Sequence, residues 1–215
     1  MNIAISASIL GSDLSNLKNE IQRIESAGAD MIHFDVMDGI FVDNISFGIP
    51  VLASIKKYTS VTLDVHLMII NPLKYIEQFA NAGADIITFH YESSSDINET
   101  IDRIHSYGKK AGLSIKPNTP LAGIIKYLHK LDMVLIMTVE PGFGGQGFIK
   151  SSLDKISALR SVIDDKGLNV DIQVDGGIND TTASLVRGAG ANNLVSGSYL
   201  FNAKYTAEAI SMLKS

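Results

Sequence analysis

The 215-residue sequence predicts an α/β protein, a single (β/α)8 TIM barrel in which residues 1–215 form one catalytic domain. Short apolar runs alternate with longer segments whose apolar residues recur three and four positions apart, which is typical of buried parallel strands joined by crossover helices. A helix-to-strand junction also recurs along the chain. Eight units of about 27 residues each leave room for a strand, a helix and two short loops, and for little else.

The predicted strands are short and rich in Ile, Val, Leu and Met. They cover residues 3–6, 31–35, 62–67, 86–89, 111–115, 133–138, 171–174 and 193–196. Helices are expected between them, with the clearest apolar stripes at residues 13–27 and 151–165. Asp13 is placed to cap the first of these helices. The two stripes consist of Leu14, Leu17, Ile21 and Ile24, and of Leu153, Ile156, Leu159 and Ile163.

The recurring junction predicts where four of the helices end. Ala-Gly-Ala-Asp precedes the second and fourth strands, Ala-Gly-Ala-Asn precedes the eighth, and Leu131-Asp132 precedes the sixth. Glycine in this position favours a left-handed helix cap. The chain is therefore expected to repeat a double unit four times, each double unit consisting of two strands with a helix after each strand. An open doubly wound sheet is the alternative fold, but SASILG follows the first strand where that fold carries GxGxxG.

Composition excludes several classes of function. Eighteen Lys and Arg against 23 Asp and Glu give a net charge of −5, which offers no attraction to nucleic acids or anionic membranes. The absence of cysteine excludes catalytic thiols, disulfides and thiolate metal sites. The first residues carry no signal-peptide pattern, and no apolar run is long enough to span a bilayer. We therefore expect a cytoplasmic protein.

Polar residues gather at the carboxyl ends of three predicted strands, where barrel enzymes carry their chemistry. His33 and Asp35 end the second strand, His66 ends the third, and Asp175 follows the seventh. Strand alternation places His33 and Asp35 on one face, which points into the barrel if Phe34 packs against the helices. Two imidazoles and two carboxylates then form an all-N/O site for Zn²⁺, Fe²⁺, Mn²⁺ or Co²⁺.

Other polar residues near these strand ends have less certain roles in the sequence. Asp64 lies one pleat deeper than His66 and is expected to orient an imidazole, whereas Asp38 is expected to stabilise a turn. His90 and Glu92, after the fourth strand, are either site residues or structural hydrogen-bonding residues. Three methionines near strand ends offer apolar contact with a substrate, with core filling as the alternative. They are Met37, Met68 and Met137.

Glycine-rich loops follow the last three strands, at residues 140–148, 176–177 and 197–198. Bare backbone N–H groups bind anions, and loops after the late strands are the usual phosphate site of this fold. A metal facing a phosphate site indicates a small phosphorylated ketose. Asp35 and Asp175 would flank its planar enediolate, one removing the proton next to the carbonyl and the other returning a proton to the opposite face.

Six segments of the sequence resemble ribulose-phosphate 3-epimerases in order and spacing, over essentially the whole chain. They are SASIL, HFDVMDG with the following FVDN, LDVHLM, PGFGGQGF, VDGG and SGS. The resemblance implies a barrel of the ribulose-phosphate-binding type, an isomerase of the pentose phosphate pathway and a homo-oligomer. It also implies a bound divalent metal and interconversion of D-ribulose 5-phosphate with D-xylulose 5-phosphate.

The same resemblance implies roles for particular residues. His33, Asp35, His66 and Asp175 would bind the metal, Asp35 would accept a proton, and Asp175 would donate one. Ser8, His66 and Asp175 would contact the substrate. Its phosphate end would be held by Gly142, Phe143, Gly144, Gly145, Gly176, Gly177, Gly197 and Ser198.

Two positions depart from the family pattern, because Ala7 and Asp43 replace prolines. Loss of proline at position 43 is expected to loosen the loop at residues 41–46, which would show as crystallographic B-factors above those of the strands.

The closest competing activity is a D-allulose 6-phosphate 3-epimerase, which shares most of the site. A barrel lyase would carry a D-x-K pattern on the second strand, and a non-catalytic sugar-phosphate-binding protein would tolerate loss of Asp35 or Asp175.

Overall fold

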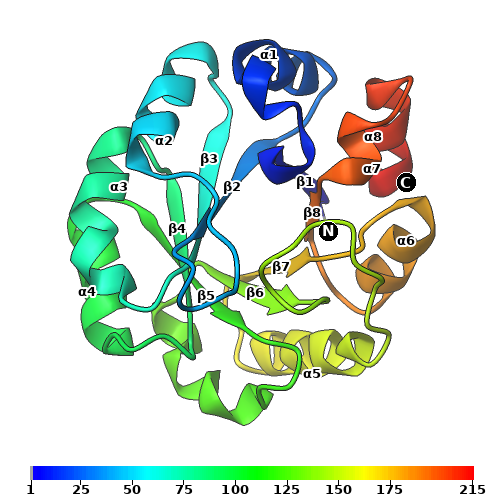
Figure 1. Ribbon diagram of the computed structural model, residues 1–215. Helices are drawn as coiled ribbons and strands as arrows, with labels where there is room; N and C mark the ends of the chain where they lie inside the picture. Colours follow the sequence, from blue (N-terminus) through cyan, green and yellow to red (C-terminus); the bar gives the residue numbers. More distant parts are fainter. Residues whose placement is uncertain (1) are drawn as a thin grey trace.

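The computed structural model describes residues 2–215, and its strands form one closed parallel barrel in which each strand pairs with the next and β8 pairs with β1. The view along the barrel in Figure 1 shows the helices as an outer ring. The strands are β1 Ala4–Ser8, β2 Met31–Met37, β3 Thr62–Met68, β4 Ile86–His90, β5 Lys110–Ile115, β6 Met133–Met137, β7 Asp171–Asp175 and β8 Asn193–Ser196. The predicted TIM barrel is confirmed.

The helices pack around this barrel mainly as crossovers between successive strands. They are α1 Leu17–Ser26, α2 Ile49–Ile55, α3 Ile76–Ala82, α4 Ile97–Ser106, α5 Ser152–Asp165, α6 Asp180–Gly188, α7 Ser198–Phe201 and α8 Thr206–Lys214. The helix predicted at residues 13–27 begins later than expected, because Leu14–Asn16 form a 3₁₀ turn before α1. Asp13 caps that turn, with its carboxylate accepting the N–H of Ser15 at 3.0 Å.

The connection between β5 and β6 differs from the expected α-helical crossover. It consists of two 3₁₀ segments, Leu121–Gly123 and Ile125–Lys130. Glycine and two successive β-branched residues, Ile124 and Ile125, lie at the centre of this segment and have low helix propensity. Gly123 also approaches Tyr91 closely, since a Cβ at this glycine would lie 2.8 Å from the Tyr91 ring.

Strand alternation divides the buried residues into two layers. Ala7 and Phe34 point outward into the core between barrel and helices, where the Phe34 ring lies 4.5 Å from that of Phe47. Their neighbours Ser6, Ser8, His33 and Asp35 belong to the opposite face and make polar contacts inside the barrel. The sequence-based assignment of His33 and Asp35 to the barrel interior is therefore confirmed.

Four hydrogen-bonded clasps, defined by Asp30, Asp85, Asp132 and Asn192, close the amino end of the barrel. The carboxylate of Asp30 accepts the N–H of Ile5 at 2.7 Å, while its own N–H donates to the Ile5 carbonyl at 3.0 Å. The other clasps repeat this two-way contact with Leu63, Ala111 and Ile172. The glycines before three of the clasps have the predicted positive φ; they are Gly28, Gly83 and Gly190. Each clasp joins the two strands of one double unit.

Within residues 2–215, no helix combines the length and the apolar character that crossing a membrane requires.

Candidate active site

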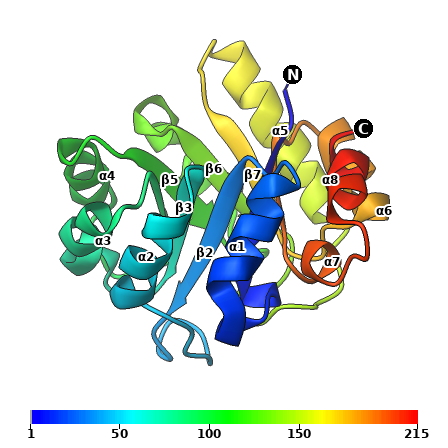
Figure 2. The ribbon, with the colours of Figure 1, turned by 90° about the horizontal axis from the view of Figure 1, so that it is seen from above.

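A cavity of about 300 Å³ opens at the carboxyl ends of the strands. Asp35 lies on its wall, at the end of β2, and Asp175 also lines it, at the end of β7. The β2 strand runs toward the loop that projects at the lower edge of Figure 2, so that loop marks this end of the barrel. Five strands end one or two residues later than predicted, whereas β6 ends one residue earlier. The longer β1 and β2 bring Ser8 and Met37 to the same rim.

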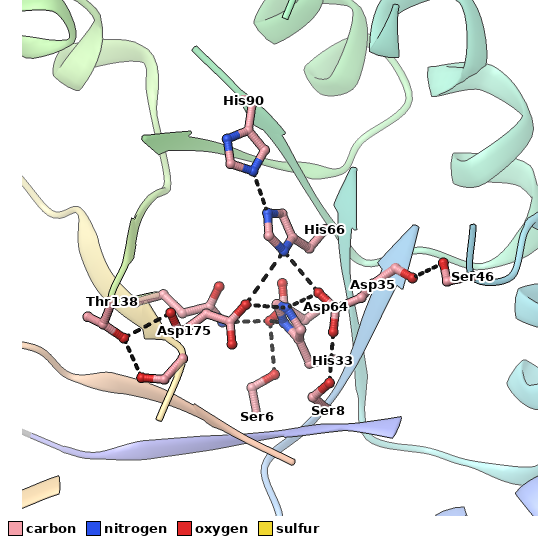
Figure 3. A network of polar contacts seen from close by, with 12 residues as sticks. Ser6, Ser8, His33, Asp35, Ser46, Asp64, His66, His90, Thr138 and Asp175 are labelled. Atoms are coloured by element: carbon pink, nitrogen blue, oxygen red, sulfur yellow. Dashed lines mark hydrogen bonds and ion pairs between the residues drawn. The ribbon is translucent and has the colours of Figure 1, made fainter. Parts of the chain in front are cut away.

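Four side chains from three strands converge at the floor of this cavity (Figure 3). His33 and Asp35 come from β2, His66 from β3 and Asp175 from β7, and one ligand atom of each lies within 4.8 Å of those of the others. The two histidines are completely buried. Asp35 is almost completely buried, and its Oδ2 accepts a hydrogen bond from the Ser8 hydroxyl at 2.7 Å. The structure thus brings the four predicted metal ligands together.

The carboxylate of Asp64 orients the imidazole of His33. Its Oδ2 lies 2.7 Å from His33 Nδ1 and accepts hydrogen bonds from the Ser6 hydroxyl at 2.9 Å and the Gln173 amide at 2.5 Å. Because a carboxylate accepts hydrogen bonds, the proton of neutral His33 lies on Nδ1. The lone pair of Nε2 then faces the cluster, 3.1 Å from Asp35 Oδ1.

His66 contacts the cluster through its other ring nitrogen. Nδ1 of His66 lies 3.0 Å from Asp35 Oδ1 and 3.8 Å from Asp175 Oδ2. Its Nε2 points away and lies 2.9 Å from Nε2 of His90, which is also completely buried. His90 Nδ1 in turn lies 3.1 Å from Glu92 Oε2. Burial lowers the pKa of His90 to about 4, so this ring is neutral at physiological pH.

The environment separates the pKa values of the two carboxyl groups. Burial, together with the nearby Asp35 carboxylate, raises the pKa of Asp175 to about 6. Burial opposes ionisation of Asp35 as well, but the adjacent His33 and His66 outweigh burial and hold the pKa of Asp35 well below its ordinary value. Two carboxyl groups with such different proton affinities can act as base and acid in one site.

The cluster has the chemistry of a divalent cation site. Nε2 of His33 is buried and has no hydrogen-bond partner among residues 2–215. Burial disfavours protonation of His33, but the carboxylates of Asp35 and Asp64 raise its pKa well above its ordinary value, so the cluster attracts positive charge. Two imidazole nitrogens and two carboxylate oxygens suit Zn²⁺ and other divalent transition metals. These residues therefore fit a bound metal ion.

The three glycine-rich loops line the other side of the cavity. Their residues at the wall include Gly142, Phe143, Gly144, Gly145, Gly176, Gly177, Gly197 and Ser198. Gly177 has φ +67°, and a Cβ at this position would lie 2.8 Å from the backbone nitrogen of Phe148. A side chain would thus collide with the neighbouring loop, and glycine keeps the backbone bare on the cavity side.

The loop after β2 is attached to both the site and the loop after β6. The Asn44 amide donates to the carbonyl of Gly142 at 2.7 Å, and the Phe41 ring lies 4.8 Å from that of His90. Asp38 stabilises the start of this loop as predicted, because its Oδ1 accepts the N–H groups of Ile40 and Phe41. The loosening expected from Asp43 stays a prediction.

Most of the residues singled out in the sequence reach this cavity. Ser8, Met37, Met68 and Met137 line it, whereas His33 and His66 lie beneath its surface. Sequence reasoning did not single out ten lining residues, although Pro141 and Gln146 lie within the predicted loop at residues 140–148. The ten are Leu10, Gly11, Val139, Pro141, Gln146, Ile178, Asn179, Val195, Ser196 and Tyr199. Their positions one to four residues from a strand end or glycine motif were the available signal.

Comparison with known proteins agrees with this site. Residues 4–201 match the model of the ribulose-phosphate 3 epimerase family. The chain is 50% identical to the ribulose-phosphate 3-epimerase of Synechocystis sp. over 211 residues, which cover 97% of this chain and 92% of that protein. It is 46% identical to the ribulose-phosphate 3-epimerase of Bacillus subtilis over 213 residues, which cover 99% and 98% of the two chains.

A solved structure with lower sequence similarity shares the fold. The 3-hexulose-6-phosphate synthase of Salmonella typhimurium matches with a TM-score of 0.70 and 18% identity, covering 99% of this chain and 97% of that one. The match across most of the chain and the high identity to two named epimerases establish the family. The chain belongs to the ribulose-phosphate 3-epimerase family and is, as its sequence predicts, an isomerase.

Proposed function

We propose that this protein interconverts D-ribulose 5-phosphate and D-xylulose 5-phosphate by two proton transfers at C3. The observation that carries the proposal is the convergence of Asp35 and Asp175 from β2 and β7 onto one cavity, with their pKa values shifted in opposite directions. Inversion at a carbon needs proton exchange on both of its faces, and two separate carboxyl groups supply this. The names of the curated relatives support the pentose phosphate substrate.

In the proposed reaction, the ionised carboxylate of Asp35 removes the C3 proton of ribulose 5-phosphate. The electron pair of the C–H bond forms the C2–C3 double bond while the π pair of the C2 carbonyl moves onto its oxygen, which leaves a planar enediolate. Protonated Asp175 then donates its proton to the opposite face of C3, which inverts the centre and leaves Asp175 ionised. The reverse reaction uses the same groups in exchanged roles, as a reversible epimerisation requires.

The divalent metal is proposed to be held by His33, Asp35, His66 and Asp175. When bound, it would neutralise negative charge developing on the substrate oxygens and so acidify the C–H bond. Asp64 keeps His33 in the tautomer whose Nε2 is free for this role. The Ser8 hydroxyl, bonded to Asp35 Oδ2, holds the other carboxylate oxygen in position.

Substrate binding is divided between the two sides of the cavity. The glycine loops after β6, β7 and β8 offer backbone N–H groups to the phosphate, and Ser198 at the start of α7 adds a hydroxyl. Met37, Met68 and Met137 lie on the wall between phosphate and metal, where their flexible side chains can cover the sugar. We place the ketose carbonyl and its adjacent hydroxyl at the metal end.

We also propose that residues 1–215 act as one catalytic domain, in a homo-oligomer, in the cytoplasm. The net charge of −5 supports action on a small metabolite without a nucleic-acid or membrane partner. A lyase of the D-x-K type is disfavoured because β2 ends in His-Phe-Asp-Val-Met with no lysine. Asp35 and Asp175 both point to the cavity, which disfavours a purely binding role.

The test is proton exchange with solvent. Metal-loaded protein is incubated with D-ribulose 5-phosphate in deuterated water, and NMR follows deuterium at C3 together with formation of xylulose 5-phosphate. Exchange and product formation are expected together. A parallel incubation with D-allulose 6-phosphate measures the preference for substrate length. Failure of exchange with both substrates would refute the epimerase proposal.

A further inference from the structure

A chain of buried polar groups leads away from His66, beyond the residues that the reaction itself uses. It runs from His66 to His90 at the end of β4, and from His90 to Glu92 in the following loop. His66 and His90 are completely buried, and the Glu92 side chain is 21% exposed. Figure 3 shows the His90 ring above His66, on the side away from Asp35 and Asp175.

The outer end of this chain has a fixed hydrogen-bond direction. Glu92 Oε1 accepts the backbone N–H of Lys116 at 2.8 Å and the hydroxyl of Thr119. A backbone N–H can only donate, so the atom at this position must be an acceptor. The second oxygen, Oε2, belongs to the same carboxylate and lies 3.1 Å from His90 Nδ1. The proton between Glu92 and His90 therefore lies on His90 Nδ1.

The proton on His90 Nδ1 determines which nitrogen carries the proton shared by the two imidazole rings. With Nδ1 protonated, neutral His90 offers only a lone pair at Nε2. His66 Nε2 lies 2.9 Å from that lone pair and must carry the shared proton, because two lone pairs would repel at this distance. This leaves Nδ1 of His66 as the atom that faces Asp35 Oδ1 at 3.0 Å, a contact that a proton or a bound cation on Nδ1 makes favourable. Nδ1 is free to bind a cation only when the remaining proton of the ring is on Nε2.

We propose that Glu92 is a positioning residue that acts through His90 to fix the Nε2–H tautomer of His66, and thereby sets the affinity of the site for divalent cations. The inference rests on the cation site of the proposed function and extends it to two residues outside the ligand set. A metal-bound histidine usually has its remote nitrogen held by one carboxylate or carbonyl. In this protein the Glu92 carboxylate does not contact His66 directly, and the His90 imidazole lies between them.

The decisive variant is Glu92→Gln, which keeps the shape of the side chain and reverses one hydrogen bond. The Gln carbonyl oxygen stays at the Oε1 position, because the Lys116 N–H there requires an acceptor. Its NH₂ group then donates to His90 Nδ1, so His90 donates from Nε2 to His66 Nε2. His66 consequently carries its proton on Nδ1, where the cation would bind.

The primary measurement is the tautomer of each histidine in metal-free protein, read from long-range ¹⁵N–¹H correlation spectra at about pH 8.5, well above the ordinary histidine pKa. We expect a proton on Nδ1 of His90 and on Nε2 of His66 in the wild type. In Glu92→Gln we expect the His90 proton on Nε2 and no proton on Nε2 of His66. Titration calorimetry with Mn²⁺ should show affinity lowered about 10–100-fold in the variant. Structural loosening alone would not invert the tautomers.

Asp43→Asn is the matched control, since it removes one carboxylate from the same rim at an exposed position outside the chain of hydrogen bonds. It should keep the wild-type tautomers and Mn²⁺ affinity. Wild-type affinity in Glu92→Gln, or equal weakening in Asp43→Asn, would overturn the proposal.

If Glu92→Gln does not fold, the wild-type spectrum alone still tests whether His66 carries a proton on Nε2. Absence of a proton on Nε2 of His66 in the native protein would refute the inference without any variant. The deuterium assay on the wild type separates this result from the proposed function. Epimerisation with the wrong tautomers would refute only the role of Glu92, whereas correct tautomers and Mn²⁺ binding without epimerisation would refute only the reaction.

Discussion

Asp175 combines a proposed catalytic role with an energetic cost in the metal-free protein. Burial and the Asp35 carboxylate raise its pKa from 3.8 to about 6. The folded state therefore binds a proton more tightly than the unfolded state, and stability falls as the pH rises from about 4 through 6. Above pH 7, the ionised Asp175 costs about 3 kcal/mol in the absence of a cation.

Asp175→Asn is accordingly expected to have opposite effects on activity and stability. Loss of the proton donor should lower kcat about 10²–10⁴-fold. Urea unfolding of the metal-free variant at pH 7.5 should show a gain of up to about 3 kcal/mol, because the buried charge and its contact with the Asp35 carboxylate are gone. This gain should shrink as the pH falls toward 4. Undiminished activity would remove Asp175 from the acid–base role, and an unchanged unfolding free energy would contradict the charge argument.

At the scale of elements, contacts at the amino ends of the strands stabilise the barrel, whereas the carboxyl ends hold the residues of the candidate active site. Each clasp residue forms hydrogen bonds with the N–H and the carbonyl of one residue on the preceding strand, and its side chain also contacts a second side chain. Asp132 accepts from the N–H of Ala111 at 2.8 Å and lies 3.0 Å from His105 Nε2. These contacts explain why an acidic or amide residue precedes the second strand of every double unit.

Asp132→Ala tests the clasp. The Ala111 N–H loses its side-chain acceptor, so the free energy of unfolding should fall by about 1–3 kcal/mol with little change in kcat. Asp165→Ala, at the exposed end of α5, is the comparison and should shift stability by no more than about 0.5 kcal/mol. Equal changes in the free energy of unfolding, measured with urea, would show that the clasp stabilises the fold no more than an exposed carboxylate does.

The order and type of the strands could be predicted from sequence because apolar runs between periodic helices leave few alternatives. The ends of the strands could not, since Ser8 and Met37 continue β1 and β2 through pairing with neighbouring strands that the local sequence does not specify. The 3₁₀ segments between β5 and β6 were missed for a related reason. The apolar pattern of residues 121–130 suits a helix face, but Gly123 and its contact with Tyr91 favour a tighter turn.

The site was more predictable than these boundaries, because strand alternation is rigid and the four ligands lie on strands rather than on loops. His33 and Asp35 share a face by a simple count of two residues. The direction of the His66–His90–Glu92 chain could not be predicted. It depends on contacts of Glu92 with the backbone of Lys116 and the hydroxyl of Thr119, which lie in a loop more than twenty residues away.

At the scale of the whole molecule, a cation should stabilise the fold, because the ligands are preassembled only in the folded barrel. Mn²⁺ at about 100 times its Kd should add about 2.7 kcal/mol, which corresponds to a rise in Tm of about 5–10 °C for a chain of this size. Differential scanning fluorimetry of chelator-treated protein with and without Mn²⁺ measures this. Asp35→Asn should lose most of the shift, and an equal shift in that variant would place the bound cation elsewhere.

The clasps at the amino end also bear on how the barrel folds. Their side chains reach backbone partners only 20 to 25 positions away in the sequence. Each double unit can therefore close its own clasp before β8 meets β1, the contact that spans nearly the whole chain. Local contacts of this kind incur little loop-closure entropy and form early. The chain thus contains four regions where folding can begin independently, and ring closure is left as the late, cooperative step.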